Sequence, residues 1–141
     1  MLLNVSYNDK KITSKIDEEV GKPFTIKERL KLSGIGSPKL FIKETSVEIH
    51  NLLILDNNRN SCNIEMRPKG IIVRFRSLLE TYALVIPYYK LTIYKGDFAI
   101  YSIYRDHYFI KVLSDTKAIQ KYFRKLLDYK ADNAPTSIED L

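Results

Sequence analysis

Two hydrophobic periods divide the chain into a strand-rich middle and a helical end. Between residues 46 and 113, runs rich in Val, Ile, Thr, Tyr and Phe alternate with short polar segments, a pattern typical of successive strands. Short turns favour antiparallel pairing, because parallel neighbours need a crossover of about a dozen residues or more. We therefore predict about seven antiparallel strands, over residues 46–55, 62–67, 71–77, 81–87, 90–95, 98–104 and 107–113.

After Leu113 the apolar residues recur at the period of a helix. Ser114 suits the N-cap position, and we predict a helix from residue 114 to about residue 130. Its apolar stripe, which we expect to pack across the sheet, consists of Ala118, Ile119, Tyr122, Phe123, Leu126 and Leu127. The opposite side of the helix is a candidate basic surface, made of Lys117, Lys121, Arg124 and Lys125.

The first third of the chain has a different pattern. Residues 4–22 are mostly polar and keep no regular period for long, so we interpret them as an arm or a loosely packed cover. Thr25 and Glu28 fit a capping box, in which each side chain satisfies a backbone N–H at the start of a helix. A short helix that ends near Leu32 is therefore predicted.

Breaks in regular structure set the domain boundaries. Two glycines and a proline interrupt the chain between residues 34 and 38, before the predicted strands begin. The residues after the C-terminal helix include Pro135 and lack an apolar face. We therefore predict an N-terminal extension with a short helix at 1–45, a main domain at 46–130 and a mobile tail at 131–141.

Antiparallel strands followed by one amphipathic helix define a mainly β, α+β fold class. This order, the segment Val-Ile-Pro-Tyr-Tyr-Lys-Leu at 85–91 and the stripe ending in Phe123, Leu126 and Leu127 resemble the pleckstrin-homology-like (PH-like) superfamily, especially its small bacterial members. The resemblance covers roughly residues 46–130. It implies a bent antiparallel sheet or partly open barrel closed by the C-terminal helix, and a non-enzymatic interaction module.

Three basic residues form a candidate anion-binding group: Lys69, Arg74 and Arg76. Their spacing is similar to the Lys, spacer, Arg-x-Arg pattern of PH-like members that bind phosphoinositides. Arg74 and Arg76 alternate with apolar residues, so they share one face of a strand and can clamp a phosphate with Lys69 in the adjoining turn. The alternative interpretation is that both arginines only solvate the exposed face of a half-buried strand.

The chain carries a net charge of +6, from 23 basic and 17 acidic residues. Such a surplus permits contact with phosphate-bearing partners but is equally compatible with simple solubility. The apolar runs at 52–55 and 83–86 are far shorter than the ~18 residues of a membrane-spanning helix, and no signal-peptide core is evident. Cys62 is the only cysteine and cannot close an intramolecular disulfide, so we expect a cytoplasmic location.

The sequence offers no catalytic or metal-binding constellation. His50 and His107 stand alone, whereas zinc sites need three or four convergent ligands. Cys62 has no histidine nearby in sequence and reads as a small buried hydrophobe, and the glycines at 34 and 36 lack the remainder of a phosphate-binding loop. Four carboxylates form no acid–base pair and read as solvated positions: Glu44, Glu48, Glu65 and Glu80. We therefore expect no cofactor and a protein that is not an enzyme.

These observations leave several functions open. The leading hypothesis is an interaction module that binds a protein partner or associates with itself. The alternative is an anion or membrane-surface domain, which would bind phospholipid headgroups through one of the two basic groups. A third is a small enzyme or a single-stranded nucleic-acid binder that stacks bases on strand tyrosines. Nucleic acid is not the expected partner, because RNP-type motifs are absent from the sequence.

Overall fold

The structure is a computed structural model that describes residues 1–55, 60–96 and 99–133. Eight strands form one antiparallel sheet in the order β1-β5-β4-β3-β2-β8-β7-β6. The strands are β1 (Leu2–Asn4), β2 (Leu40–Thr45), β3 (Ser61–Arg67), β4 (Gly70–Ser77), β5 (Glu80–Pro87), β6 (Thr92–Lys95), β7 (Ile100–Arg105) and β8 (Tyr108–Leu113). The helices are α1 (Lys10–Val20), α2 (Ile26–Lys31), α3 (Val47–Leu53) and α4 (Lys117–Asn133), with a 3-10 turn η1 (Tyr88–Lys90).

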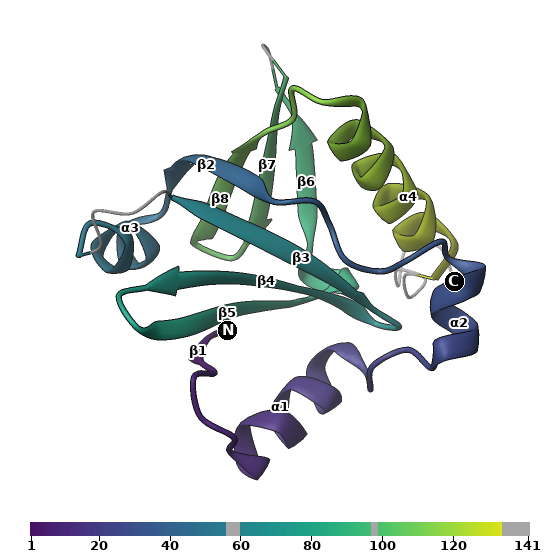
Figure 1. The fold of residues 1–141 in the computed structure, drawn as a ribbon, viewed down its shortest axis with the longest axis horizontal. Coiled ribbons are helices and arrows are strands. Elements are labelled where there is room, and N and C mark those ends of the chain that lie inside the picture. Colours follow the sequence, from purple (N-terminus) through teal and green to yellow (C-terminus); the bar gives the residue numbers. More distant parts are fainter. Residues whose placement is uncertain (56–59, 97–98, 134–141) are drawn as a thin grey trace.

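Strand β2 joins two halves of the sheet and lies at the bend between them. Leu40 and Phe41 pair with β3, whereas the strand from Ile42 onward pairs with β8, with a shift of register between Ile42 and Glu44. Irregularities of this kind bend a strand and increase its twist. Figure 1 shows β6, β7 and β8 running at a steep angle to β3, β4 and β5. The sheet does not close, since β1 and β6 are its two ends.

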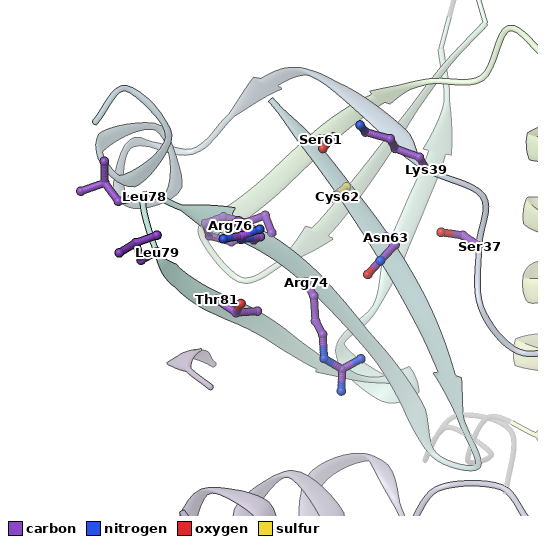
Figure 2. Close-up of a pocket in the computed structure, with 11 residues that line it drawn as sticks. Ser37, Lys39, Ser61, Cys62, Asn63, Arg74, Arg76, Leu78, Leu79 and Thr81 are labelled. Carbon is purple, nitrogen blue, oxygen red and sulfur yellow. The ribbon is translucent and has the colours of Figure 1, made fainter. Parts of the chain in front are cut away.

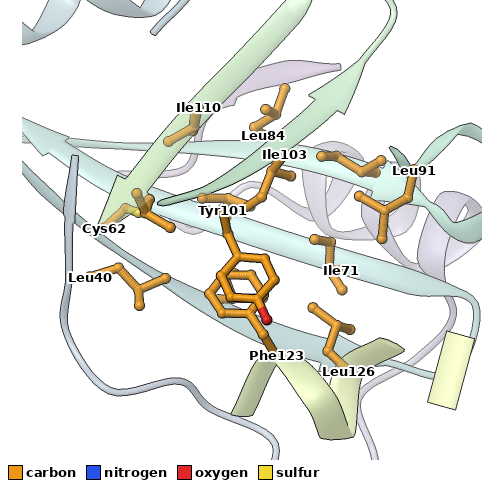
Figure 3. Packing of buried hydrophobic residues seen from close by; sticks show 14 of the residues in the cluster. Leu40, Cys62, Ile71, Leu84, Leu91, Tyr101, Ile103, Ile110, Phe123 and Leu126 are labelled. Atoms are coloured by element: carbon orange, nitrogen blue, oxygen red, sulfur yellow. The ribbon is translucent and has the colours of Figure 1, made fainter. Parts of the chain in front are cut away.

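The main core lies between the two halves of the sheet, and α4 closes it. Phe123 of α4 is fully buried, and its ring stacks on Tyr101 of β7 with 4.2 Å between the ring centroids. Figure 3 shows this pair surrounded by apolar side chains such as Leu40 and Ile71. The hydroxyl of buried Tyr122 donates to the carbonyl oxygen of Ile35 at 2.8 Å. The predicted packing of the C-terminal helix on the sheet is therefore confirmed.

Helix α1 covers part of the outer face of the sheet, beside β4 and β5 (Figure 1). Ile16 and Val20 pack there on Ile72 of β4 and on outward-facing residues of β5, forming a second small core. The helix approaches so closely that a Cβ atom on Gly70 would lie 2.6 Å from Cγ1 of Val20. The polar N-terminal segment thus contains a helical cover with a buried apolar edge.

Six of the predicted strands are confirmed, from 62–67 to 107–113, with ends that agree to within two residues. The strand predicted over 46–55 is wrong, because α3 occupies this segment. Its buried residues Ile49 and Leu53 are four positions apart, which is a helical spacing. The sheet has eight strands instead of about seven because β1 and β2, which lie within the predicted extension at 1–45, also belong to it.

The two predicted helix starts have different outcomes. The capping box is confirmed, since the Glu28 N–H donates to Oγ1 of Thr25 at 3.2 Å and the Thr25 N–H donates to Oε1 of Glu28 at 3.0 Å. The predicted N-cap at Ser114 is wrong. Helix α4 begins later, where the Ile119 N–H donates to Oγ1 of Thr116 at 3.2 Å.

Parts of the chain for which we made predictions lie outside the described residues. They are residues 56–59, residues 97 and 98, and residues 134–141 of the predicted tail. Helix α4 itself continues beyond its predicted end, as far as Asn133.

Candidate anion-binding groove

The two arginines of the candidate anion-binding group lie on the outer face of β4. Because side chains alternate along a strand, Val73 and Phe75 enter the core while Arg74 and Arg76 point away from it. The predicted alternation is confirmed. Arg76 is exposed, and no carboxylate of the described residues lies within ion-pair distance of it. Arg74 is half-buried.

A groove of about 760 Å³ lies over this face. In Figure 2, Arg74 and Arg76 of β4 lie between Asn63 of β3 and Thr81 of β5, and Lys39 approaches from the segment before β2. Three of the lining residues are cationic, and none of the described residues that line the groove is acidic. Hydroxyl and amide groups beside guanidinium groups are the donors that bind carboxylate and phosphate oxygens. The arrangement is therefore suited to an anion.

Glu65 of β3 orients Arg74 from the margin of the groove. Nη1 of Arg74 donates to Oε1 of Glu65 at 2.7 Å, and Nε of Arg67 donates to the other carboxylate oxygen. Burial alone would raise the pKa of Glu65, but the hydrogen bonds and charges of Arg67 and Arg74 outweigh it and lower the pKa below its usual value. Our interpretation of Glu65 as a solvated position is therefore wrong. A guanidinium group has five N–H donors, so Arg74 keeps others for a ligand.

Arg67 connects this pair to the helical cover. Its side chain is buried, and Nη1 lies 3.2 Å from Oδ1 of Asp17 and donates to the carbonyl oxygen of Gly21 at 2.9 Å. Both partners belong to the C-terminal part of α1 or its cap. The ion network Asp17–Arg67–Glu65–Arg74 thus extends from α1 to the edge of the groove.

Lys69 lies apart from the two arginines that the sequence grouped with it. It occupies the turn between β3 and β4, where its backbone N–H donates to the carbonyl oxygen of Val20 at 2.9 Å. Strand residues advance about 3.3 Å each, so the Cα atoms of Lys69 and Arg74 are roughly 16 Å apart along the strand. Lys39 is the third cation that lines the groove, and Lys69 is not among the lining residues.

The candidate basic surface on α4 is only partly open. Lys117, Lys121 and Arg124 are exposed. Lys125 is half-buried, and its amine donates to the carbonyl oxygen of Gly34 at 2.8 Å. Burial, followed by repulsion from Lys121, lowers the pKa of Lys125. Lys125 thus helps to hold the loop after α2 against α4, and none of these four residues lines the groove.

Two other side chains with reactive groups are Cys62, in the core, and His107, on the surface. Cys62 is buried, and burial raises the pKa of its thiol to about 12. His107 lies on the surface, 3.4 Å from the carboxylate of Glu48. Within the described ranges, no group of three or more His, Cys, Asp and Glu side chains could hold a metal ion.

The tyrosines of the strands and of η1 divide between core and surface. Tyr88 and Tyr101 are buried in the main core, so they cannot stack on a ligand. Tyr94 is exposed and packs edge-on against Tyr104, which in turn contacts Phe109, with 5.7 Å between the ring centroids in both pairs. The rings of Tyr94, Tyr104 and Phe109 therefore pack on one another.

Sequence reasoning did not single out Lys39, Asn63 or Thr81 as site residues. Asn63 lies opposite Arg74 in the β3–β4 ladder, and Thr81 lies opposite Arg76 in the β4–β5 ladder. Residues directly opposite share a face of the sheet, so the registers of two hairpins would have revealed both of them. No local signal marks Lys39, because its position depends on the pairing of the start of β2 with β3.

Comparison of the chain with protein-family models, with curated proteins and with solved structures finds no match. Among the helices of the described residues, none is both long and apolar enough to span a membrane.

Proposed function

We propose that the protein is a non-enzymatic interaction module that binds an anionic segment of a protein partner in the groove over β3 and β4. The charge of the groove is the observation that carries this proposal. Lys39, Arg74 and Arg76 line it, while the described lining residues include no acidic side chain. An excess of one charge in a concave site attracts ligands of the opposite charge and repels those of the same charge.

The order of strands and helix supports a PH-like module. Strands β2 to β8 follow one another with antiparallel pairing, and α4 comes next and packs on the core. This is the order that the resemblance implies, with β2 in place of the strand expected over 46–55. We propose on this basis that the chain is PH-like, with β1 added at the sheet edge beside β5 and α1 added to the outer face. In this proposal, Lys39 lines the groove from the segment just before β2. The N-terminal segment at 1–45 therefore contributes directly to binding.

A protein partner suits the groove better than a membrane surface does. Leu78 and Leu79 lie at one end of the groove and are 54% and 89% exposed. Apolar side chains beside cations match a polypeptide that carries both acidic and apolar residues. The alternative, a phospholipid headgroup site on α4, has only Lys117, Lys121 and Arg124 fully available, and stable membrane attachment generally takes two signals.

Binding of fluorescent poly-L-glutamate, followed by anisotropy in ~150 mM salt, tests the proposed site. The protein with Lys39→Gln and Arg76→Gln should bind at least about tenfold more weakly, because two donors to carboxylates are lost. The matched control is Lys117→Gln with Lys121→Gln, which removes the same charge from α4 and should change binding less than about twofold.

Two results would contradict the proposal. If both double variants lose binding equally, net charge and not the groove attracts the polyanion. If the α4 variant alone loses binding, the helix is the anion site and the membrane-surface alternative is favoured. Size-exclusion chromatography with light scattering then shows whether the partner is a second copy of this chain.

A further inference from the structure

We infer that the groove recognises an extended peptide segment with acidic residues at alternate positions followed by an apolar residue, acid-x-acid-x-apolar. The inference rests on the proposed function and specifies the partner chemistry that the groove selects. Three observations carry it: the spread of the cations, their spacing along β4, and the apolar residues at the end of that strand.

The cationic groups are spread along the groove. Figure 2 shows the guanidinium group of Arg74 directed toward α1, while Lys39 lies on the far side of β3 and Arg76 lies apart from both. In this view the charged groups of the three side chains point in different directions and do not converge on one point. The groove therefore suits an extended ligand with several negative charges better than a single phosphate or carboxylate.

The spacing of Arg74 and Arg76 along β4 matches the two-residue repeat of an extended peptide. They are two residues apart on one strand, so their Cα atoms are about 6.6 Å apart. A peptide in the extended conformation presents every second side chain to one side with the same repeat. Acidic residues at alternate positions would therefore face Arg74 and Arg76 in register, whereas adjacent acidic residues would point to opposite sides.

The turn after β4 supplies an apolar position. Leu78 follows Arg76 by two residues, in the turn between β4 and β5, and it lines the groove together with Leu79. Leu78 has a φ of 57°, a left-handed conformation that is uncommon for residues other than glycine. Leu78 and Leu79 are both exposed at the end of the arginine row. An apolar side chain of the ligand would pack there and release water.

The groove does not favour nucleic acid, the other extended polyanion. Proteins that bind single strands combine cations with exposed aromatic rings on which bases stack. Phe75 is the only aromatic residue among the described residues that line the groove, and it is 2% exposed. The exposed ring of Tyr94 and the half-buried rings of Tyr104 and Phe109 lie on β6 to β8 and do not line the groove.

Fluorescence anisotropy with labelled synthetic peptides and the full chain tests the inference. One peptide has the sequence Gly-Ser-Glu-Ser-Glu-Ser-Leu-Ser-Gly, and a second has the same composition with the two glutamates adjacent. The alternating peptide should bind about tenfold more tightly, because both acids reach an arginine. Arg76→Gln should remove this preference, whereas Arg124→Gln on α4 should preserve it. Leu79→Ser should weaken binding several-fold, whereas Leu30→Ser, which alters a leucine of α2 that is 77% exposed, should not.

The possible failures can be distinguished. Equal binding of both peptides, lost in Arg76→Gln, would overturn the alternating pattern and leave the proposed function intact. No binding of either peptide, together with no binding of poly-L-glutamate, would overturn both. Tighter binding of a short oligothymidylate than of the alternating peptide, dependent on Arg76, would replace the peptide ligand with nucleic acid.

Discussion

The outer face of β4 has two ends that differ in what covers them. At the first end, Ile72 is fully buried beneath α1, with Val20 of the helix packed on it. At the second end, Arg76 faces a groove and is exposed. Both positions belong to one face of one strand. One strand face thus contributes to a small core at one end and to a candidate binding site at the other.

The residue pattern of β4 changes at the point where the cover of α1 ends. Residues 71–73 are three consecutive apolar residues, and all of them are buried, so both faces of the strand are covered there. From Arg74 onward apolar and basic residues alternate, and only one face is covered. A change from a continuous apolar run to alternation within one strand therefore marks the edge of a covering element.

A covered side and an exposed side also differ on α4, and we expect the largest change in the free energy of unfolding there. Phe123→Ala should destabilise the protein by roughly 3–5 kcal/mol, because the ring is fully buried against Tyr101. Lys121→Ala, on the exposed side of the helix, should cost less than about 0.5 kcal/mol. Urea denaturation of both variants measures the difference, and equal losses would mean that α4 is rotated.

On β4 itself, Ile72→Ala should destabilise by roughly 2–5 kcal/mol, since it leaves a cavity beneath α1. Arg76→Ala should change the free energy of unfolding by less than about 0.5 kcal/mol, because its side chain is exposed. The same urea experiment compares them. A large loss on Arg76→Ala would show that this end of the face is covered too.

The ion network at the boundary between the two ends should have an intermediate effect. Arg67→Met removes the buried donor to Asp17, Gly21 and Glu65, and we expect a loss of about 1–3 kcal/mol. Hydrogen exchange should also become faster in α1, which loses its attachment to β3. Unchanged exchange in α1 would contradict the role that we assign to Arg67.

Acid should weaken this network in a predictable direction. The pKa of Glu65 is lowered in the folded protein, so its ion pairs contribute stability above the usual carboxyl pKa of about 4.3, and this is lost as pH falls through the folded value. Compared with Glu65→Gln, the native protein should be more stable at neutral pH, and the gap should narrow below about pH 4. Urea denaturation at several pH values measures the gap, and a constant gap would exclude this ion-pair contribution.

The smallest effect is expected from the basic surface of α4. Apart from the exposed Ala118, its apolar stripe packs in the core, so no second signal supports attachment to lipid. We expect no appreciable cosedimentation with anionic liposomes at ~150 mM salt, and no change on substituting Lys117 and Lys121 by Glu. Robust cosedimentation that these substitutions abolish would favour the membrane-surface alternative.

The strands from 61 to 113 and the packing of α4 could be predicted from the sequence because their signals are local. Strand-forming runs end at turn residues, as at Pro87, and the stripe around Phe123 has a clear helical period. The segment 46–55 misled us because Val47 and Ile49 also fit the alternation of a strand. Helix α1 carried a usable signal in Ile12, Ile16 and Val20, which are four residues apart, but its many polar residues obscured it.

The candidate site could be predicted only in part. Arg74 and Arg76 share a face because of alternation, which one strand encodes by itself. Lys39 belongs with them only because the start of β2 pairs with β3, a tertiary contact that local patterns do not specify. Lys69 is five residues from Arg74, so the rise per residue of a strand separates the two side chains, and the sequence alone could have shown this.

The position of β2 at the bend has a consequence for synthesis of the chain on the ribosome. Leu40 pairs with Cys62, which follows soon after it, but Ile42 pairs with Val112, which is made much later. The second half of β2 therefore remains an unpaired strand edge while β3 to β7 are being synthesised. Such edges promote association between chains. We expect nascent chains that stop before β8 to be held by chaperones, and release to follow once β8 and α4 have left the ribosome.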